Sequence, residues 1–319
     1  MDAALSRRRL EGLYVTIPTM FHDDAEFSVD HDFIGRHVQF LIDGGVVTGK
    51  GVVLAGGAAG DFMTMTFDER VAVAKTVVKA AAGRVPVVMG GQTTSTLELV
   101  RLARAAVSVG AEYLQISPPF YFANTEGDFY EYALAAASAA PDLGLIVYNT
   151  YWTSAGVSSD LVGRLADIPN VIALKWATPS SDNMEFEEIV ATQSGRFTII
   201  DNQLRWLTSH ILGARSIEAF EANYWPQWAL GIWQALEDGR YAEVQREMVR
   251  VALPLHKMWA EIERYTSGNG YPVKLCLEVL GMGSSRDRPP TRDVREKFLG
   301  RARQMMLQCG VPGVTGSAA

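Results

Sequence analysis

The stretch Val171-Ile172-Ala173-Leu174-Lys175 decides how the rest of the chain is interpreted. Four apolar residues, two of them β-branched, lead directly into a lysine, and Pro169-Asn170 and Thr178-Pro179 bound the run. This pattern predicts a short buried strand that ends in a cation. Burial disfavours a charged ammonium, and lowering a lysine pKa from about 10.4 to about 7 corresponds to roughly 4 to 5 kcal/mol. A neutral amine of this kind could attack a carbonyl and form a Schiff base.

A second run, Leu145-Ile146-Val147-Tyr148, has the same form and ends in a phenol. The two polar exits are separated by about the length of one βα unit. We therefore expect Tyr148 and Lys175 to end neighbouring parallel strands.

Eight segments of strand character alternate with eight segments of helical character after a polar leader. The expected strands are 12–18, 52–54, 85–89, 113–116, 145–148, 171–175, 197–200 and 216–220. The expected helices are 30–42, 67–82, a segment ending at 109, segments from about 127, from 158, from 182 and from 203, and 225–236. Thr66 and Glu69 form a capping-box pattern at the start of one of these helices.

The strand starts recur about every 29 residues, which predicts a TIM (β/α)8 barrel. An open doubly wound sheet is the alternative, but here the first strand runs into Pro18-Thr19-Met20, with no glycine fingerprint. We expect a catalytic barrel domain over residues 1–238. A C-terminal extension over 239–319 would hold three helices, at 241–265, 273–280 and 291–309.

Barrel geometry brings the carboxyl ends of the strands together at the reactive face. Strict alternation would turn Val171, Ala173 and Lys175 inward, together with Ile146 and Tyr148. Adjacent strands lie about 4.8 Å apart, so the amine and the phenol could reach one small substrate. The phenol could then move protons at the imine. The alternatives are a lysine that extends its amine to solvent and an ordinary aromatic at a strand end.

Composition narrows the class of protein. The chain has 319 residues, 48% hydrophobic content and a net charge of −7, and its longest basic run is Arg7-Arg8-Arg9, so we expect no nucleic-acid partner. No apolar stretch reaches the roughly 20 residues that cross a bilayer. Cys276 and Cys309 form no CxxC pair. We therefore expect a soluble cytoplasmic protein without a membrane partner.

Several stretches resemble, in order and spacing, the superfamily of N-acetylneuraminate lyase and dihydrodipicolinate synthase, the class I Schiff-base aldolases. They are Gly12-Leu-Tyr-Val-Thr-Ile-Pro-Thr-Met20, Leu41-Ile-Asp-Gly-Gly45, Gly56-Gly-Ala-Ala-Gly-Asp61, Val85-Pro-Val-Val-Met-Gly90, Ser117-Pro-Pro119, Val147-Tyr-Asn149, Ile172-Ala-Leu-Lys175 and Tyr271-Pro-Val-Lys274. The resemblance covers nearly the whole chain.

The resemblance implies a Schiff base between Lys175 and pyruvate or another 2-oxo acid, with Tyr148 as proton shuttle. The loop Gly57, Ala58, Ala59 and Gly60 would bind the substrate carboxylate. A second relay tyrosine, contributed across a dimer interface in dihydrodipicolinate synthase, would fall at Phe120 or Tyr121. The resemblance also implies a homotetramer, a dimer of dimers, without metal or organic cofactor.

Two departures from the family pattern bear on the substrate. Ala58-Ala59 stands where relatives often have two threonines, so a hydroxyl of the proton relay is missing. Tyr151-Trp152-Thr153-Ser154 replaces the region of an arginine that would hold a second substrate carboxylate. We therefore expect a lyase other than a true dihydrodipicolinate synthase. Gly56-Gly57 with Asp61-Phe62 is closer to the 5-dehydro-4-deoxyglucarate dehydratases of the same superfamily.

Three further residues lie near the two exits. Glu218, on the eighth strand, would place a carboxylate near the imine if it points inward; otherwise it would pair with Arg215 or Arg205. Trp152 and Trp176 flank the exits and suggest an acceptor with a flat or apolar part, or else they pack against the next helix.

Other chemistries have little support. No Gly-Lys-Ser/Thr follows the glycine-rich segment, the five histidines form no HxH or HExxH metal motif, and no Gly-x-Ser-x-Gly elbow exists. The leading hypothesis is an aldolase that makes or breaks a carbon–carbon bond, with an aldehyde as co-substrate or product. The alternatives are a dehydratase or hydratase-aldolase that uses the same imine, and a non-catalytic ligand-binding protein on the same fold.

Overall fold

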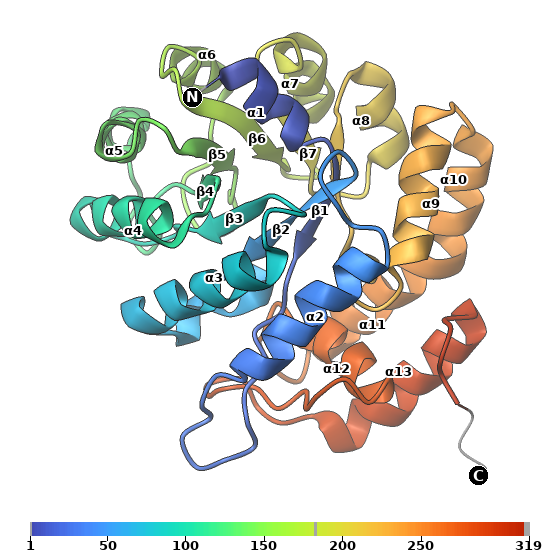
Figure 1. Ribbon diagram of the computed structural model, residues 1–319. Coiled ribbons are helices and arrows are strands. Elements are labelled where there is room, and N and C mark those ends of the chain that lie inside the picture. Colours follow the sequence, from blue (N-terminus) through green and yellow to red (C-terminus); the bar gives the residue numbers. More distant parts are fainter. Residues whose placement is uncertain (1, 182–183, 316–319) are drawn as a thin grey trace.

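Eight parallel strands close into a barrel in the order of the sequence, as predicted (Figure 1). The computed structural model describes residues 2–181 and 184–315. The strands are β1 (Gly12–Thr16), β2 (Gly51–Ala55), β3 (Val87–Gly90), β4 (Tyr113–Ile116), β5 (Gly144–Tyr148), β6 (Val171–Trp176), β7 (Thr198–Asp201) and β8 (Ser216–Glu218).

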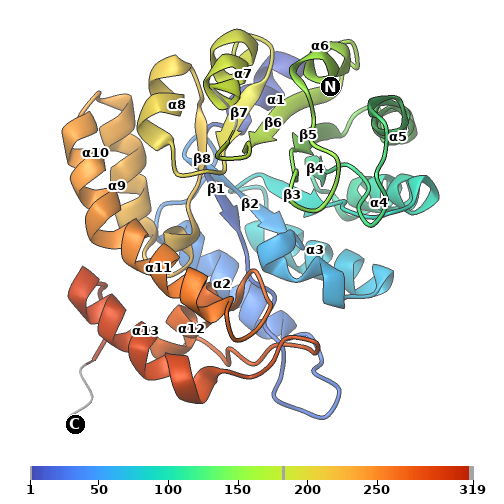
Figure 2. The ribbon, with the colours of Figure 1, turned by 180° about the vertical axis from the view of Figure 1, so that it is seen from behind.

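A ring of helices covers the outside of the barrel (Figure 2). They are α2 (His31–Asp43), α3 (Phe67–Ala81), α4 (Thr96–Val109), α5 (Glu126–Ala139), α6 (Ser159–Leu165), α7 (Glu185–Gln193), α8 (Trp206–Leu212) and α9 (Pro226–Glu237). The predicted capping box is present, because Thr66 and Glu69 each accept the backbone N–H of the other. Residues 182–183, where the sixth expected helix was to begin, lie outside the described residues.

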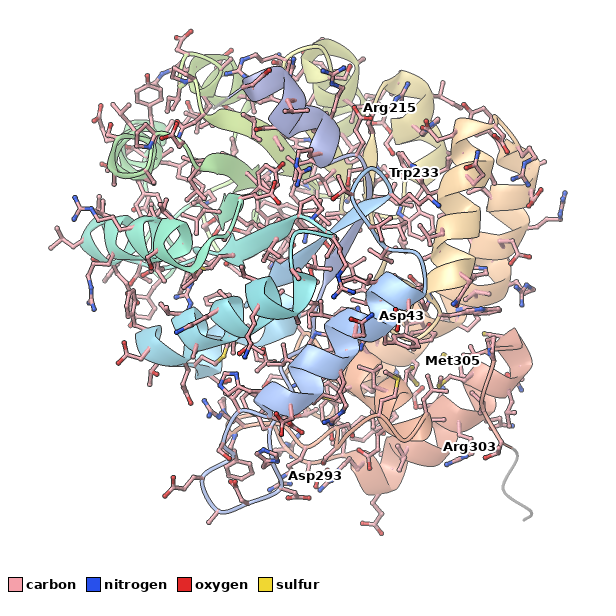
Figure 3. All side chains as sticks on the ribbon, in the orientation of Figure 1. Asp43, Arg215, Trp233, Asp293, Arg303 and Met305 are labelled. Carbon is pink, nitrogen blue, oxygen red and sulfur yellow. The ribbon has the colours of Figure 1, made fainter. Side chains whose placement is uncertain are left out.

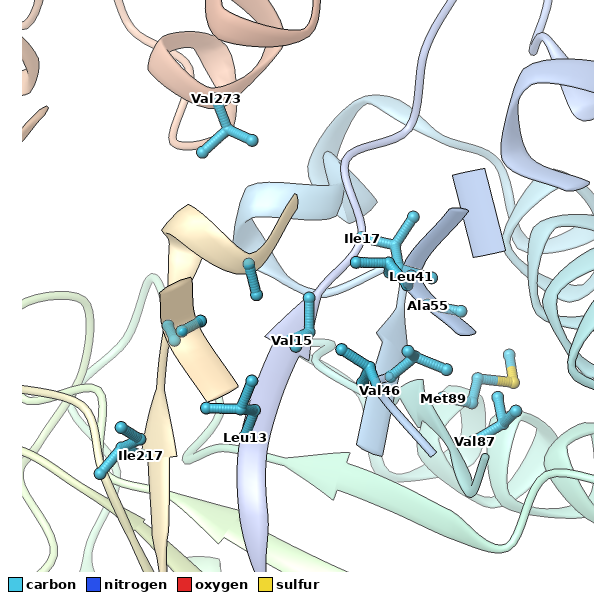
Figure 4. Packing of buried hydrophobic residues seen from close by; sticks show 14 of the residues in the cluster. Leu13, Val15, Ile17, Leu41, Val46, Ala55, Val87, Met89, Ile217 and Val273 are labelled. Carbon is cyan, nitrogen blue, oxygen red and sulfur yellow. The ribbon is translucent and has the colours of Figure 1, made fainter. Parts of the chain in front are cut away.

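Apolar side chains form two separate layers. The outer layer packs the barrel against its helices, and Figure 4 shows Leu13 and Val15 on β1 and Ile17 just beyond its end within this layer. The inner layer fills the barrel and consists of Leu10, Tyr14, Val52, Leu54, Val88, Tyr113, Ile146, Ile172, Ala173 and Ile200. The barrel is thus a packed core whose polar chemistry is confined to its ends.

The expected inward set on β6 was wrong at its first residues. Leu145 pairs with Val171 and Ile146 pairs with Ala173, so Ile172 is an extra residue in a β-bulge. Ile172 therefore joins Ala173 in the inner layer, and Val171 belongs to the outer one. Beyond the bulge the alternation holds, and Lys175 points inward.

An unpredicted helix, α1 (Ala3–Arg9), covers the amino-terminal mouth of the barrel. The Tyr113 hydroxyl donates to the Ser6 carbonyl at 3.0 Å, and the Thr198 hydroxyl donates to the Arg7 carbonyl at 3.0 Å. This segment, expected to be a polar leader, closes the end of the barrel opposite to the reactive face.

The C-terminal helices pack onto the barrel through the same outer layer. They are α10 (Tyr241–Glu247), the π-helical η4 (Met248–Ala252), α11 (Leu253–Ile262), α12 (Tyr271–Val279) and α13 (Arg295–Cys309). Trp233 on α9 and Met305 on α13, both labelled in Figure 3, belong to this layer together with Val273 on α12. The domain boundary at residue 238 stays a prediction. Within the described ranges, no helix is both long and apolar enough to cross a membrane.

Candidate active site

Lys175 and Tyr148 lie opposite each other at the carboxyl ends of β6 and β5. They are partners in the strand register, and the Lys175 Nζ is 4.5 Å from the centre of the Tyr148 ring. The same nitrogen is 5.0 Å from the centre of the Tyr14 ring. Only 3% of Lys175 is exposed. The amine and the phenol therefore meet inside the barrel mouth, and Lys175 does not reach out to bulk solvent.

Two opposing effects act on the Lys175 amine. Burial, the larger effect, lowers its pKa, whereas the negative charge and hydrogen bond of Glu218 raise it. Glu218 forms an ion pair with the Lys175 Nζ, and its other oxygen accepts a hydrogen bond of 2.6 Å from the Thr16 hydroxyl. The net result is a lysine pKa below its ordinary value, with a carboxylate in contact that can take up the proton.

The Tyr148 hydroxyl is held by Asn202, whose amide donates to it at 2.8 Å. Because its oxygen is the acceptor of this bond, the phenol keeps its own proton for another partner. Burial, followed by the nearby Glu218 charge, raises the pKa of Tyr148. Tyr148 therefore stays protonated at neutral pH and is suited to donating a proton to a developing oxyanion.

A cavity of about 500 Å³ opens above Tyr148. The described residues that line it are Ala58, Phe62, Met63, Gln92, Ser117, Phe120, Tyr148, Thr150, Trp152, Thr153, Glu263, Thr266, Ser267, Gly268 and Asn269. Loops at the carboxyl ends of β2 to β5 supply most of them, and the segment between α11 and α12 supplies the rest. The cavity thus occupies the position expected for the reactive face of this fold.

The glycine-rich segment after β2 forms a short 3-10 turn, η1 (Ala58–Gly60). The N–H groups of Gly60 and Asp61 donate within the turn, to Gly57 and Ala58. Those of Ala58 and Ala59 begin the turn, where no carbonyl of the same turn can accept them. These two amides are the groups with which the turn could hold a carboxylate.

Lys274 ties this turn to helix α12. Its fully buried Nζ lies 2.7 Å from the Asp61 carboxylate and 3.0 Å from that of Asp287. Burial raises the pKa of Asp61 to about 7, with Lys274 opposing and Asp287 adding to the shift. The two aspartates raise the pKa of Lys274 against the effect of burial, so the lysine remains charged.

Comparison with known proteins identifies the family. The model of the dihydrodipicolinate synthetase family matches residues 9–308. The chain belongs to this family. Its members are Schiff-base lyases of the aldolase type, and the chain is therefore an enzyme of that class. The alternative of a non-catalytic ligand-binding protein is not supported.

Similar proteins cover almost the whole chain. A 4-hydroxy-tetrahydrodipicolinate synthase from Thioalkalivibrio sulfidiphilus is 29% identical over 90% of this chain and 94% of its own length. The crystal structure of dihydrodipicolinate synthase from Aquifex aeolicus matches with a TM-score of 0.82 and 27% identity, covering 95% of this chain and 99% of that one. A synthase from Acinetobacter baumannii, complexed with pyruvate, matches at 24% identity with a TM-score of 0.83, covering 95% and 99%. Because these relatives are all named as this synthase, the expectation of a lyase other than a true dihydrodipicolinate synthase is not confirmed.

Glu218 takes the inward position, and the predicted alternative of a salt bridge to Arg215 or Arg205 is wrong. Arg205 pairs with Glu187 at 2.7 Å, and the Arg215 guanidinium donates to backbone carbonyls. The reason is register, because Glu218 pairs with Tyr14 of β1 at the reactive end of the barrel. Arg215 precedes β8 and lies at the opposite end.

Some of the remaining predicted site residues line the cavity and others do not. Ala58, Phe120, Trp152 and Thr153 line the cavity, whereas Gly57, Ala59 and Gly60 are not among its lining residues. Tyr121 is 85% exposed, has a φ of +88° and contacts the Phe122 ring. Of the two positions considered for the relay tyrosine, Phe120 thus faces the cavity without a hydroxyl, and Tyr121 carries the hydroxyl on the surface.

The two tryptophans that flank the exits have different roles. Trp152 is 52% exposed, lines the cavity and packs edge-on against Tyr148, with ring centres 5.7 Å apart. Trp176 is fully buried in the outer layer between barrel and helices. The expected aromatic wall therefore contains Trp152 but not Trp176.

Several residues of the site were missed from the sequence. Thr16, Gln92 and Asn202 stand at or just beyond the ends of β1, β3 and β7, and the strand-exit rule that singled out Lys175 could have found them. Gln115 faces inward from β4 and accepts a hydrogen bond of 2.8 Å from the Tyr14 hydroxyl, beneath the amine. No local signal pointed to residues 263–269, which reach the cavity only through the packing of the C-terminal helices.

Proposed function

We propose that Lys175 forms an imine with pyruvate or another 2-oxo acid, and that the resulting enamine makes or breaks a carbon–carbon bond with an aldehyde. One observation carries the proposal: a buried amine contacts the Glu218 carboxylate and lies beside the Tyr148 phenol below a cavity. The complex of the related Acinetobacter baumannii synthase with pyruvate supports the choice of a 2-oxo acid.

The reaction is balanced with the groups present. Lys175 passes a proton to Glu218, and the neutral amine attacks the carbonyl carbon of the 2-oxo acid. Loss of water gives the imine, and loss of a C3 proton gives the enamine, which attacks the aldehyde carbon. The Glu218 carboxylate gives its proton to the departing water and then takes up the proton released at C3, and Tyr148 donates its proton to the aldehyde oxygen and is reprotonated by Glu218. Hydrolysis then frees Lys175 and a 4-hydroxy-2-oxo acid.

In this mechanism Glu218 replaces the missing hydroxyls of the glycine-rich turn. Ala58 and Ala59 can offer only backbone N–H groups, which suit the carboxylate of the 2-oxo acid but cannot relay protons. The Glu218 carboxylate, oriented by Thr16, contacts the nitrogen at which the imine forms. The mechanism thus uses two proton carriers, Glu218 and Tyr148, both of which lie close to the Lys175 amine.

The dehydratase alternative is supported by the same carboxylate. A protonated Glu218 next to the enamine could donate to a departing hydroxyl group and release water. Mass spectrometry of the products from 2-oxo acids with and without a hydroxyl at C4 separates the two reactions. Loss of 18 mass units indicates dehydration, and release of pyruvate with an aldehyde indicates cleavage.

We also infer assembly into a homotetramer, a dimer of dimers. Tyr121 and Phe122 place two exposed aromatic rings side by side, 4.9 Å apart, at the edge of the cavity loop. The Tyr121 ring is 85% exposed, so a partner subunit could cover it. Analytical ultracentrifugation of the parent and of Tyr121→Ala tests this assembly.

Borohydride trapping tests the central proposal. Reduction in the presence of pyruvate should add pyruvate irreversibly to Lys175, as located by peptide mass spectrometry. Lys175→Ala should lose both trapping and turnover while its circular dichroism at room temperature stays close to that of the parent, and its melting temperature should fall because Glu218 loses its buried partner. Lys79→Ala, an exposed lysine of α3, serves as the matched control. Trapping at another lysine, or none with any 2-oxo acid, would exclude this mechanism.

A further inference from the structure

The walls of the cavity above Tyr148 are largely aromatic and apolar. The Phe62 and Phe120 rings meet edge-on with their centres 6.1 Å apart, and the Trp152 ring, which also lines the cavity, packs edge-on against Tyr148. Met63 and Trp152 are each more than half exposed, so they hold apolar area that a bound molecule would cover. Such walls favour a flat or apolar ligand.

The cavity offers little to a second anion. Of the described residues that line it, none is a lysine or an arginine, and Glu263 is the only charged one. Arg70 lies behind Phe62, with its guanidinium 5.3 Å from the ring centre and one nitrogen donating to the Gly90 carbonyl. A carboxylate on the acceptor would therefore meet Glu263 and no lining cation.

Among the described residues that line the cavity, Gln92 stands out because its buried side-chain polar atoms have no partner. It is only 3% exposed, yet neither its side-chain oxygen nor its side-chain nitrogen has a hydrogen-bond partner in the described structure. Unpaired buried amides are costly, because each group loses its bonds to water. An amide that lines a cavity can recover those bonds by receiving a polar group of a ligand.

We propose that the acceptor aldehyde of this enzyme is an uncharged, flat molecule that carries one hydrogen-bonding group, and that Gln92 recognises this group. The proposal rests on the proposed Schiff-base function and names the second substrate of the same site. Phe62, Phe120 and Trp152 enclose the flat part, while Tyr148 protonates the aldehyde oxygen. Gln92 takes no part in the imine chemistry and acts in specificity alone.

A panel of matched aldehydes tests the proposal with pyruvate as donor. Initial rates of carbon–carbon bond formation are measured for benzaldehyde, 3-hydroxybenzaldehyde, 4-(hydroxymethyl)benzaldehyde and the charged 4-carboxybenzaldehyde. In the parent, kcat/KM for a neutral hydroxyl-bearing aldehyde should exceed that for the charged one by about tenfold or more. Gln92→Leu should reduce kcat/KM for the neutral hydroxyl-bearing aldehyde about tenfold. It should change kcat/KM for benzaldehyde by no more than about twofold.

Two controls separate this inference from the proposed function. Gln92→Leu should trap pyruvate at Lys175 as the parent does, and Gln245→Leu, an exposed glutamine of α10, should leave every rate unchanged. Normal trapping without turnover of any neutral aromatic aldehyde overturns this inference alone. Preference for the charged aldehyde, or an equal loss with all aldehydes in Gln92→Leu, also overturns it. Failure of trapping in the parent overturns both.

Discussion

Glu218 and Lys175 form a buried ion pair where β8 and β6 end inside the barrel. Among the described residues, neither Glu218 nor Lys175 has another ion-pair partner. The Thr16 hydroxyl donates to the carboxylate oxygen that does not contact the amine. Burial alone would strongly favour a neutral amine, whereas the carboxylate favours the ammonium. Glu218 thereby sets the pH at which Lys175 becomes nucleophilic, in addition to carrying its proton.

Replacing Glu218 by glutamine should change both the pH at which Lys175 becomes reactive and the rate of turnover. Loss of the negative charge removes the effect that raises the pKa of Lys175, so the amine should deprotonate at a lower pH. The acid limb of the pyruvate-trapping rate, measured against pH, should therefore move to lower pH. Turnover at the plateau should fall by about 10²- to 10⁴-fold, as for loss of a general acid–base group.

Glu187→Gln is the matched control for Glu218→Gln. It removes a carboxylate that pairs with Arg205 on the helical ring, away from the amine. Its pH profile and turnover should equal those of the parent. A pH profile of Glu218→Gln that moves to higher pH would contradict the assigned role of the carboxylate.

Replacing Tyr148 by phenylalanine should slow turnover by about 10²-fold or more while imine formation continues. The Asn202 amide loses its acceptor, but the ring and the amine beside it remain. Single-turnover trapping and steady-state turnover are compared in the same preparation. Tyr113→Phe is the control, because that hydroxyl bonds to Ser6 at the opposite end of the barrel. A Tyr148→Phe enzyme as fast as the parent would remove the phenol from the mechanism.

The barrel could be predicted because its signals are local and repeated. Each strand is a short apolar run, and Lys175 and Tyr148 stand at the ends of two of them. The bulge at Ile172 could not be predicted by alternation, because nothing in the run Val171 to Lys175 distinguishes an extra residue from a paired one. The inward direction of Lys175 was still predicted correctly, because the bulge lies before it in the strand.

Partners of the site residues depend on tertiary structure, which the sequence does not display. Glu218 is three residues from Arg215, yet it pairs with Lys175 because barrel closure brings β8 and β6 to the same mouth. Helix α1 was missed because its stability comes from capping the barrel, through bonds such as that from Thr198 to Arg7. Its local signals are an N-cap at Asp2 and arginines in its last turn, and over seven residues these are too weak to predict a helix.

Removing the buried Lys274 charge should destabilise the fold. Lys274→Met leaves Asp61 and Asp287 facing each other without their cation, and breaking a buried pair costs about 3 to 5 kcal/mol. The pKa of Asp61 in the folded protein is about 7, above its ordinary value, so protonation favours the folded state and stability falls as pH rises toward 7. Without Lys274, this pKa should rise further. The decrease in the free energy of unfolding caused by Lys274→Met should therefore be larger at pH 8 than at pH 5.

Urea unfolding at both pH values measures the effect of Lys274→Met. Lys75→Met, an exposed lysine on α3, should change the free energy of unfolding by less than about 0.5 kcal/mol at either pH. A loss for Lys274→Met that is equal at pH 5 and pH 8 would show that Asp61 does not titrate with the fold.

A methyl group added at Gly270 should weaken binding of the 2-oxo acid. A Cβ at this position would lie 2.3 Å from the Ala59 carbonyl oxygen, so the turn must shift away from α12. Because the amides of Ala58 and Ala59 are the proposed carboxylate ligands, KM for pyruvate should rise about tenfold in Gly270→Ala, as for loss of one or two hydrogen bonds to a charged group. Gly300→Ala, which meets no atom within 4 Å, should leave KM unchanged. If KM stays the same while only the melting temperature falls, the turn supports the fold and does not hold the carboxylate.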